Sequence, residues 1–95
     1  MNERIRTEEV DNLCMAMSML DNPDEASRLL EDLCTIREIQ DLAQRLAVAD
    51  MLDRGEPYTS ISEKTGASAT TIARVSKALN YGSGGYRLIL DKLGL

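Results

Sequence analysis

Apolar residues recur every three or four positions through most of this chain, which is the spacing that places side chains on one face of an α-helix. No segment alternates apolar and polar residues between turn signals, as a half-buried strand would, and no internal repeat is evident. The pattern therefore predicts an all-α protein with six helices.

The first predicted helix begins after Thr7, whose hydroxyl group can cap it. Met15 and Met19 lie off its main apolar stripe and widen the apolar surface, so we expect burial on two sides, although methionine also serves as a core filler. The residues of the stripe are spaced by three and four: Val10, Leu13, Cys14, Met17 and Leu20.

Two further helices have clear start signals. Pro23 suits the first position of a helix that is capped by Asn22. The segment Thr35-Ile36-Arg37-Glu38 is a capping box, in which the hydroxyl and carboxylate groups each accept a backbone N–H of the other residue. It opens the longest helix, which should run to about Arg54 and stop at Gly55. The broad apolar surface of this helix places it at the centre of the fold.

The stretch from Tyr58 to Leu79 predicts two short helices joined by a tight turn, a helix-turn-helix. Gly66 suits the turn because the required backbone conformation disfavours a Cβ atom. Thr59 and Ser68 can each accept a backbone N–H at a helix start. The inward residues of the second helix would be Ile72, Val75 and Leu79. Its opposite face would then be free to enter a DNA groove.

A glycine-rich turn and a last helix, from Arg87 to about Leu93, complete the chain. We expect Tyr81 and Tyr86 to anchor the two ends of the turn. A phosphate-binding loop is excluded because no strand precedes the glycines and no Gly-Lys-Ser/Thr follows them.

Composition favours one domain of residues 1–95 with an aliphatic core, because the chain has three tyrosines but no Phe or Trp. So short a chain buries limited surface, which favours a homodimer. The charged N-terminus and the lack of a long apolar run predict a cytoplasmic protein with no membrane association. Cys14 and Cys34 lie in apolar helical patterns and are expected to be buried thiols, not metal ligands.

Charge is divided unevenly along the chain, although the whole carries a net charge of −5. Residues 1–57 hold six Arg and fourteen Asp or Glu, whereas residues 58–95 hold five Lys or Arg and two acids. A basic C-terminal part beside an acidic body suits a protein that presents one small face to phosphates.

Catalysis is not expected. The chain has no histidine, no cluster of metal ligands and no Ser or Cys beside a plausible base. Its paired carboxylates, such as Asp24-Glu25, are better explained as solvated charges at helix starts.

The layout resembles the tryptophan repressor family over nearly the whole chain. The resemblance rests on the capped central helix that ends at Arg54-Gly55 and on the segments Gly66-Ala67 and Thr71-Ile72-Ala73-Arg74. The segment LNYGSGGYRL is similar to a Trp-repressor-related branch of Gram-positive bacteria. The resemblance implies an intertwined homodimer, with residues 7–57 as dimerisation and core helices, 58–79 as the helix-turn-helix and 80–95 as the turn and C-terminal helix.

The resemblance also implies an effector pocket of Thr35, Arg45 and Arg74, in which the two arginines would sandwich an indole ring. However, the family's glycine after the second arginine is Val75 here, and its ligand-binding serine is Ala78. Overpacking of this kind costs about 1–3 kcal/mol and a lost hydrogen bond about 1 kcal/mol. We therefore expect no tryptophan cofactor, and the identity of any effector is open. The arginines could instead pair with carboxylates or contact phosphates.

The sequence thus predicts a sequence-specific DNA-binding regulator, a repressor, with double-stranded DNA as its partner. Few of the candidate contact residues can read bases through paired hydrogen bonds, so water and DNA shape should contribute to specificity. An alternative is a helical adaptor that binds protein through the same scaffold, which the acidic N-terminal half supports. The candidate DNA-contacting residues are Thr59, Ser68, Ala69, Thr70, Ala73, Arg74 and Lys77.

Overall fold

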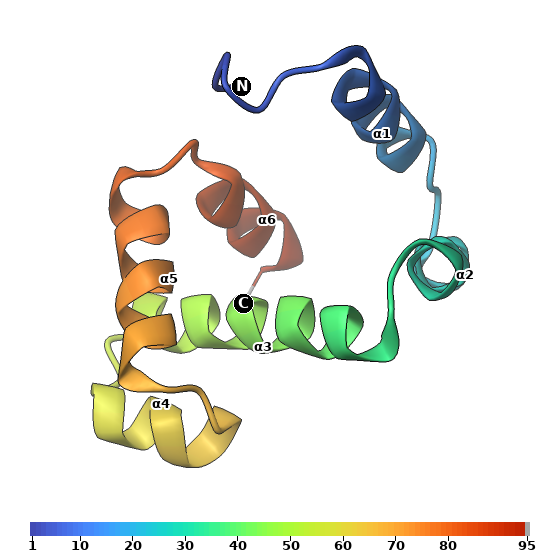
Figure 1. Ribbon diagram of the computed structural model, residues 1–95. Coiled ribbons are helices and arrows are strands. Elements are labelled where there is room, and N and C mark those ends of the chain that lie inside the picture. Colours follow the sequence, from blue (N-terminus) through green and yellow to red (C-terminus); the bar gives the residue numbers. More distant parts are fainter. Residues whose placement is uncertain (95) are drawn as a thin grey trace. The chain divides into compact units, whose positions relative to one another are not determined.

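The computed structural model describes residues 1–94, which form six α-helices and contain no strand (Figure 1). The predicted all-α, six-helix architecture is confirmed. Within the described residues, no helix is both long enough and apolar enough to cross a membrane. The helices are α1 (Glu8–Ser18), α2 (Pro23–Leu33), α3 (Ile36–Asp53), α4 (Tyr58–Thr65), α5 (Ala69–Tyr81) and α6 (Gly85–Leu93).

The first two helices begin where capping side chains satisfy backbone donors, as the sequence predicted. The hydroxyl oxygen of Thr7 accepts the N–H of Val10 at 3.1 Å. The side-chain oxygen of Asn22 accepts the N–H of Glu25 at 2.9 Å, and Pro23 is the first residue of α2. Each cap removes one of the unpaired donors that a helix start leaves exposed.

The capping box of α3 is confirmed in both directions. The Glu38 N–H donates to the Thr35 hydroxyl at 3.1 Å, and the Thr35 N–H donates to the Glu38 carboxylate at 2.8 Å. The hydrogen bond from the Thr35 N–H favours the charged carboxylate and lowers the pKa of Glu38. The helix ends at Asp53, one residue before the predicted end, and Gly55 follows in a left-handed conformation with φ of +82°.

The contacts of the chain define two compact units, residues 1–39 and the chain from Gln40 onward, so the division falls within α3. The first unit contains α1 and α2, neither of which has a buried residue in the single chain. Cys14 is exposed and Cys34 is half-buried, so the expected burial of both thiols is wrong for the single chain. The expected burial of α1 on two sides is not seen there either. The predicted grouping of residues 7–57 concerns a dimer and stays a prediction.

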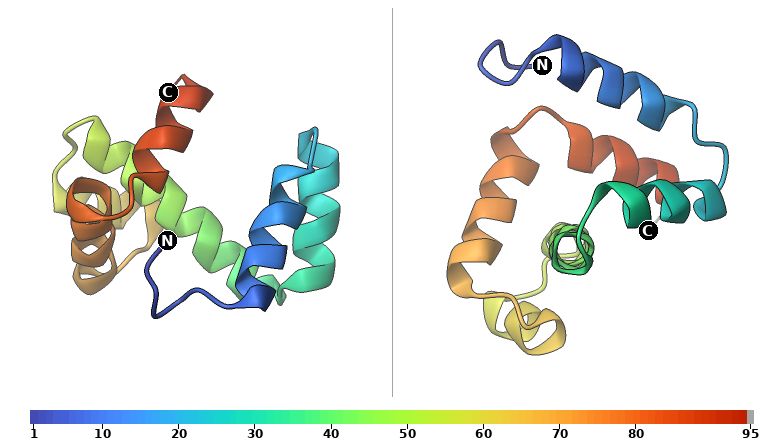
Figure 2. Two further views of the ribbon diagram at one scale, coloured as in Figure 1. Left: turned by 90° about the horizontal axis from the view of Figure 1, so that it is seen from above. Right: turned by 45° about the vertical axis from the view of Figure 1, so that its right-hand side comes forward.

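The second unit holds the buried core, which is aliphatic as expected. Helix α4 meets α5 at its N-terminal end and α6 meets it at its C-terminal end, with a sharp turn of the chain before α6 (Figures 1 and 2). Residues from α3, from α4 and the following turn, from α5 and from α6 all contribute to the core. The buried residues are Val48, Ala49, Ile61, Ala67, Ile72, Val75 and Leu90.

The turn between α5 and α6 is shorter than predicted. Helix α5 continues two residues past Leu79 to Tyr81, and α6 begins at Gly85 instead of Arg87. Tyr81 is 86% exposed, so its expected anchoring role is wrong, because it lies on the outside of the last turn of α5. Tyr86 is half-buried and packs against the core, as an anchor should.

We predict that Gly82→Ala lowers the free energy of unfolding by about 2 kcal/mol, because the backbone shift that relieves a steric overlap of this kind typically costs about 1–3 kcal/mol. A Cβ atom at Gly82 would lie 2.4 Å from the carbonyl oxygen of Ala78, which is backbone of the preceding helix turn. Chemical denaturation at one protein concentration measures the change.

Gly85→Ala is the matched control, since a Cβ atom at Gly85 meets nothing within 4 Å and the residue begins a helix. Equal stability of the two variants would show that the close approach at Gly82 is not a constraint.

Candidate nucleic-acid interface

The turn between α4 and α5 is fixed by a short network of hydrogen bonds. Gly66 adopts the left-handed conformation with φ of +74°, as its place in the turn predicted. The Thr65 hydroxyl donates to the carbonyl of Ile61 at 2.7 Å and accepts the N–H of Ala67 at 3.1 Å. The Ser62 hydroxyl donates to the carbonyl of Ala67 at 2.9 Å. Polar backbone groups of the turn are thus paired by side chains that are close to them in the sequence.

The start of α5 was predicted correctly, but the start of α4 was not. Ser68 caps α5, and its hydroxyl oxygen accepts the N–H of Thr71 at 3.1 Å. Helix α4 instead begins at Tyr58 after Pro57, which makes no side-chain cap. Thr59 is therefore the second residue of the helix and not its cap. It remains exposed beside the N-terminus of α4, where helical N–H groups favour an anion.

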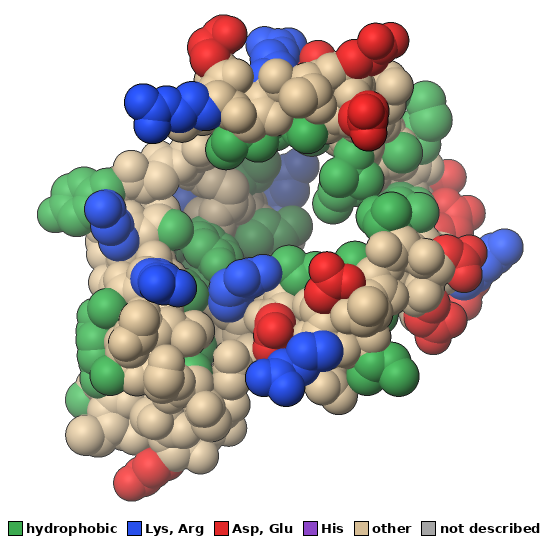
Figure 3. Space-filling model, viewed as in Figure 1, with side chains coloured by type: hydrophobic (Ala, Val, Ile, Leu, Met, Phe, Trp, Pro, Cys, Tyr) green, Lys and Arg blue, Asp and Glu red, His purple; other side chains and the backbone are tan. Residues whose placement is uncertain are grey.

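Helix α5 has one buried face and one exposed face. Ile72 is fully buried, Val75 is 2% exposed and Leu79 is half-buried, all on the inward side. The helix contains no acidic residue, and Figure 3 shows Lys and Arg side chains over it. The candidate DNA-contacting residues are all exposed: Thr59, Ser68, Ala69, Thr70, Ala73, Arg74 and Lys77.

The cationic side chains at this surface differ from most others in the chain because they form no ion pair with any residue of the described part. This holds for Arg74 and Lys77 of α5 and for Arg45 of α3. In contrast, Lys64 of α4 contacts the carboxylate of Glu56 at 2.6 Å, and its hydrogen bond lowers the pKa of Glu56. Pairing with a carboxylate therefore does not account for Arg45 or Arg74 within residues 1–94.

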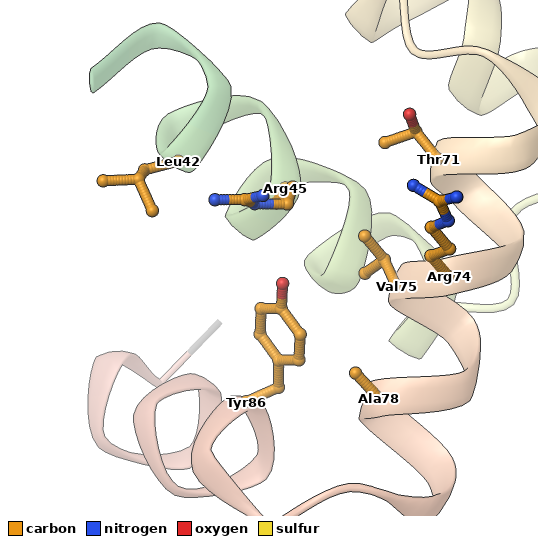
Figure 4. Close-up of a pocket in the computed structure, with 7 residues that line it drawn as sticks. All are labelled: Leu42, Arg45, Thr71, Arg74, Val75, Ala78 and Tyr86. Atoms are coloured by element: carbon orange, nitrogen blue, oxygen red, sulfur yellow. The ribbon is translucent and has the colours of Figure 1, made fainter. Parts of the chain in front are cut away.

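A cavity of about 460 Å³ opens between α3, α5 and α6 in the second unit (Figure 4). Arg45 and Arg74 both line it, and the effector role that the family resemblance implies for them stays a prediction. Thr35 is not part of the lining, and its hydroxyl and N–H are used in the cap of α3. The lining residues are Leu42, Arg45, Thr71, Arg74, Val75, Ala78 and Tyr86.

Sequence reasoning missed the contribution of Tyr86 to this cavity. In Figure 4 its side chain extends from α6 into the space between α3 and α5, with the hydroxyl group toward Arg45. A usable signal was present, because Tyr86 lies four residues before buried Leu90 and so shares its helix face.

An ion pair that the sequence did not indicate joins the end of α3 to α6. The guanidinium group of Arg87 donates to both carboxylate oxygens of Asp53 and also contacts Asp91 at 3.3 Å. The hydrogen bonds lower the pKa of Asp53 and raise that of Arg87. This pair links the end of α3 to α6, the helix that carries Tyr86. Its partners are 34 residues apart, so no local pattern could reveal them.

No group of three or more potential metal ligands occurs within residues 1–94.

Comparison with known proteins matches residues 8–94 to the family model described as Trp repressor protein. The uncharacterised protein YerC of Bacillus subtilis (strain 168) is 46% identical over 91 residues, which cover 96% of this chain and 88% of that protein. A TrpR-like protein from Eubacterium eligens has a crystal structure that is similar with a TM-score of 0.93, at 46% identity, covering 99% of this chain and 97% of that one. A protein from Staphylococcus aureus, described as a candidate Trp repressor, is similar with a TM-score of 0.90, at 41% identity, covering 97% and 92%.

The ion pair of Asp53 predicts a specific dependence of stability on pH. Because the folded-state pKa of Asp53 lies below its ordinary value of 3.8, the pair stabilises the fold above that pH and is lost as the pH falls through the folded-state value. Between about pH 5 and about pH 2, the parent should therefore lose more unfolding free energy than Asp53→Asn.

Denaturation curves at several pH values measure this difference, with Glu63→Gln as the control for loss of one acidic group. Parallel curves for the parent and Asp53→Asn would contradict the stabilising role of the pair.

Proposed function

The chain belongs to the Trp repressor protein family, and from this premise we propose that it is a sequence-specific transcriptional regulator, a repressor, that binds DNA as a homodimer. The family is one of regulatory DNA-binding proteins and not of enzymes. The observation that carries the proposal is the division of α5, which buries Ile72 and Val75 and leaves Arg74 and Lys77 exposed and without an ion pair in the described chain. In this proposal, α4 and α5 act as a helix-turn-helix with α5 in the major groove.

The exposed residues of α5 divide by the DNA groups that they would contact. Arg74 can donate two hydrogen bonds to guanine or contact a phosphate, and Lys77 suits a phosphate. The small apolar groups of Ala69 and Ala73 suit thymine methyl groups. Thr59 lies at the N-terminus of α4, where its hydroxyl and the helix N–H groups would bind a phosphate. With few side chains that read bases directly, bound water and DNA shape would contribute much of the specificity.

The first unit supports the homodimer. Helices α1 and α2 bury no residue in the single chain, and several large apolar side chains of this unit are more than half exposed, among them Met15, Met19 and Ile36. A helix with an apolar stripe needs a partner surface, and contiguous exposed apolar groups mark such an interface. A second copy would provide it and would present two α5 helices to successive major grooves, one helical turn of DNA apart.

The alternative is an adaptor that binds protein through the same scaffold. The observation in its favour is the charge of residues 1–57, which hold fourteen Asp or Glu and six Arg. That acidic part would repel a DNA backbone, but it could face away from the DNA while the basic residues make the contact. Retention of DNA separates the two functions.

We predict that the purified protein retains fragments from a genomic DNA pool and releases them as salt rises, because cations on α5 replace counterions at phosphates. The double variant Arg74→Ala with Lys77→Ala should lose retention, since it removes both cations of α5. Sequencing of retained fragments should give a palindrome with half-sites about one helical turn apart.

The matched control removes two cations elsewhere, Arg28→Ala with Lys92→Ala, and should retain DNA as the parent does. Circular dichroism checks that both double variants are folded. Equal retention by the Arg74 and Lys77 variant would refute the contact surface, and no retention by the parent would favour the adaptor.

We also predict that tryptophan does not bind at micromolar concentration. Val75 lines the cavity and is only 2% exposed, so its side chain is packed in the core and has little room to move aside. Ala78, which also lines the cavity, offers no hydroxyl group to a ligand. Overpacking and a missing hydrogen bond together weaken binding by about 30-fold or more. Isothermal titration calorimetry measures this directly, and a micromolar dissociation constant would show that the cavity still accepts the amino acid.

A further inference from the structure

The ring of Tyr86 separates two hollows in the second unit. One is the cavity of about 460 Å³ that Arg45 and Arg74 line. The other, of about 390 Å³, is lined by residues that include Leu46 and Ile89. Tyr86 and Ala78 line both. Removal of the ring would therefore join two spaces that it now keeps apart.

Tyr86 differs from the other two tyrosines of the chain. Tyr58 is 43% exposed and Tyr81 is 86% exposed, whereas Tyr86 is half-buried and packs against the core. Figure 4 shows its side chain crossing from α6 toward the space between α3 and α5. It is the one aromatic side chain among the residues that line the cavity.

We propose that Tyr86 is a positioning residue for DNA binding: its aromatic ring, supplied from within the chain, packs against the core beside the cavity between α3 and α5 and so holds α5 in its DNA-binding position without a bound small molecule. This inference rests on the proposed function, because the position of α5 matters through the contacts of its exposed face.

The ring is held in place before any ligand arrives. Leu90, one helical turn further along α6, is 2% exposed, and Arg87 is paired with Asp53 at the end of α3. A helix fixed in this way, here α6, loses little conformational freedom when α5 binds DNA, which is the advantage of a preorganised site.

The link from the ring to DNA passes through α5. Arg74 lines the cavity and also belongs to the exposed candidate surface, and the adjacent Val75 lines the cavity from the core side. Without the ring, the two hollows would join and α5 would lose a packing contact, so it would have more than one way to pack and DNA would bind only the competent fraction of molecules. The apparent affinity falls by that fraction.

The test compares Tyr86→Ala with Tyr86→Phe, and uses Tyr81→Ala as the matched control on the exposed tyrosine. DNA affinity is measured by fluorescence anisotropy on a fragment that the parent retains. Tyr86→Ala should bind about tenfold more weakly, whereas Tyr86→Phe, which keeps the ring, should stay within about twofold of the parent. Tyr81→Ala should match the parent.

Chemical rescue distinguishes positioning from a general loss of stability. The probe is p-cresol, which corresponds to the tyrosine side chain and should enter the space left in Tyr86→Ala, as small aromatics enter engineered apolar cavities. It should restore DNA affinity to Tyr86→Ala and have no effect on the parent. Tenfold weaker binding with rescue supports the inference. Parent-like affinity of Tyr86→Ala, weaker binding without rescue, or tighter DNA binding by the parent with p-cresol overturns it.

Two further measurements cover the cases in which the parent binds no DNA or Tyr86→Ala does not fold. If the parent binds no DNA, the proposed function fails, and calorimetry of p-cresol then decides whether the Tyr86 ring occupies a defined packing site: binding to Tyr86→Ala and not to the parent supports this, and equal behaviour overturns it. If circular dichroism shows that Tyr86→Ala is unfolded, Tyr86→Leu replaces it. Weaker DNA binding by Tyr86→Leu than by Tyr86→Phe supports the need for a ring, and equal binding overturns it.

Discussion

The packing of α5 onto α4 and the core is the constraint on which the rest of the structure depends. Ile61 of α4 and Ile72 of α5 are both fully buried, and Val75 is 2% exposed. Loss of a buried side chain of this size typically costs about 2–5 kcal/mol, a large part of the 5–15 kcal/mol that stabilises an ordinary domain. Because these residues occupy one face of α5, the opposite face must be exposed. The surface that we assign to DNA is thus a consequence of the core.

The distribution of ion pairs follows the same division. In the second unit, Asp53 forms an ion pair with Arg87, and Glu56 forms one with Lys64. The cations of α5 have no acidic residue on their own helix and no ion pair in the described chain. A cation without a carboxylate partner needs no ion pair to be broken before it contacts a phosphate. The acidic balance of the whole chain therefore does not oppose a local site for a polyanion.

Much of the fold could be predicted from the sequence because its signals are local. The caps at Thr7, Asn22, Thr35 and Ser68 each depend on residues within three positions, and all four form as predicted. The inward residues of α5 followed from helical spacing. The start of α4 was predicted wrongly because two neighbouring residues can each mark a helix start. Pro57 precedes the helix, which begins at Tyr58, so Thr59 lies inside the helix and is not its cap. Burial of the thiols was predicted wrongly for the single chain, because an apolar helical stripe does not tell whether its own chain or a second chain covers it.

The candidate site was predicted in part, and the missing part was non-local. Exposure of the α5 residues follows from the period of the helix, and the meeting of Arg45 with Arg74 at one cavity came from the family resemblance. The ring of Tyr86 reaches the same cavity from a helix that begins after the glycine-rich turn, and nothing in the spacing of α3 or α5 indicates it. The family resemblance did not predict the position of this ring either, because it implies a ligand in the cavity. A ring of the chain itself that packs beside that space changes the physical problem, since the free energy of ordering the ring is then part of folding and does not depend on the concentration of an effector.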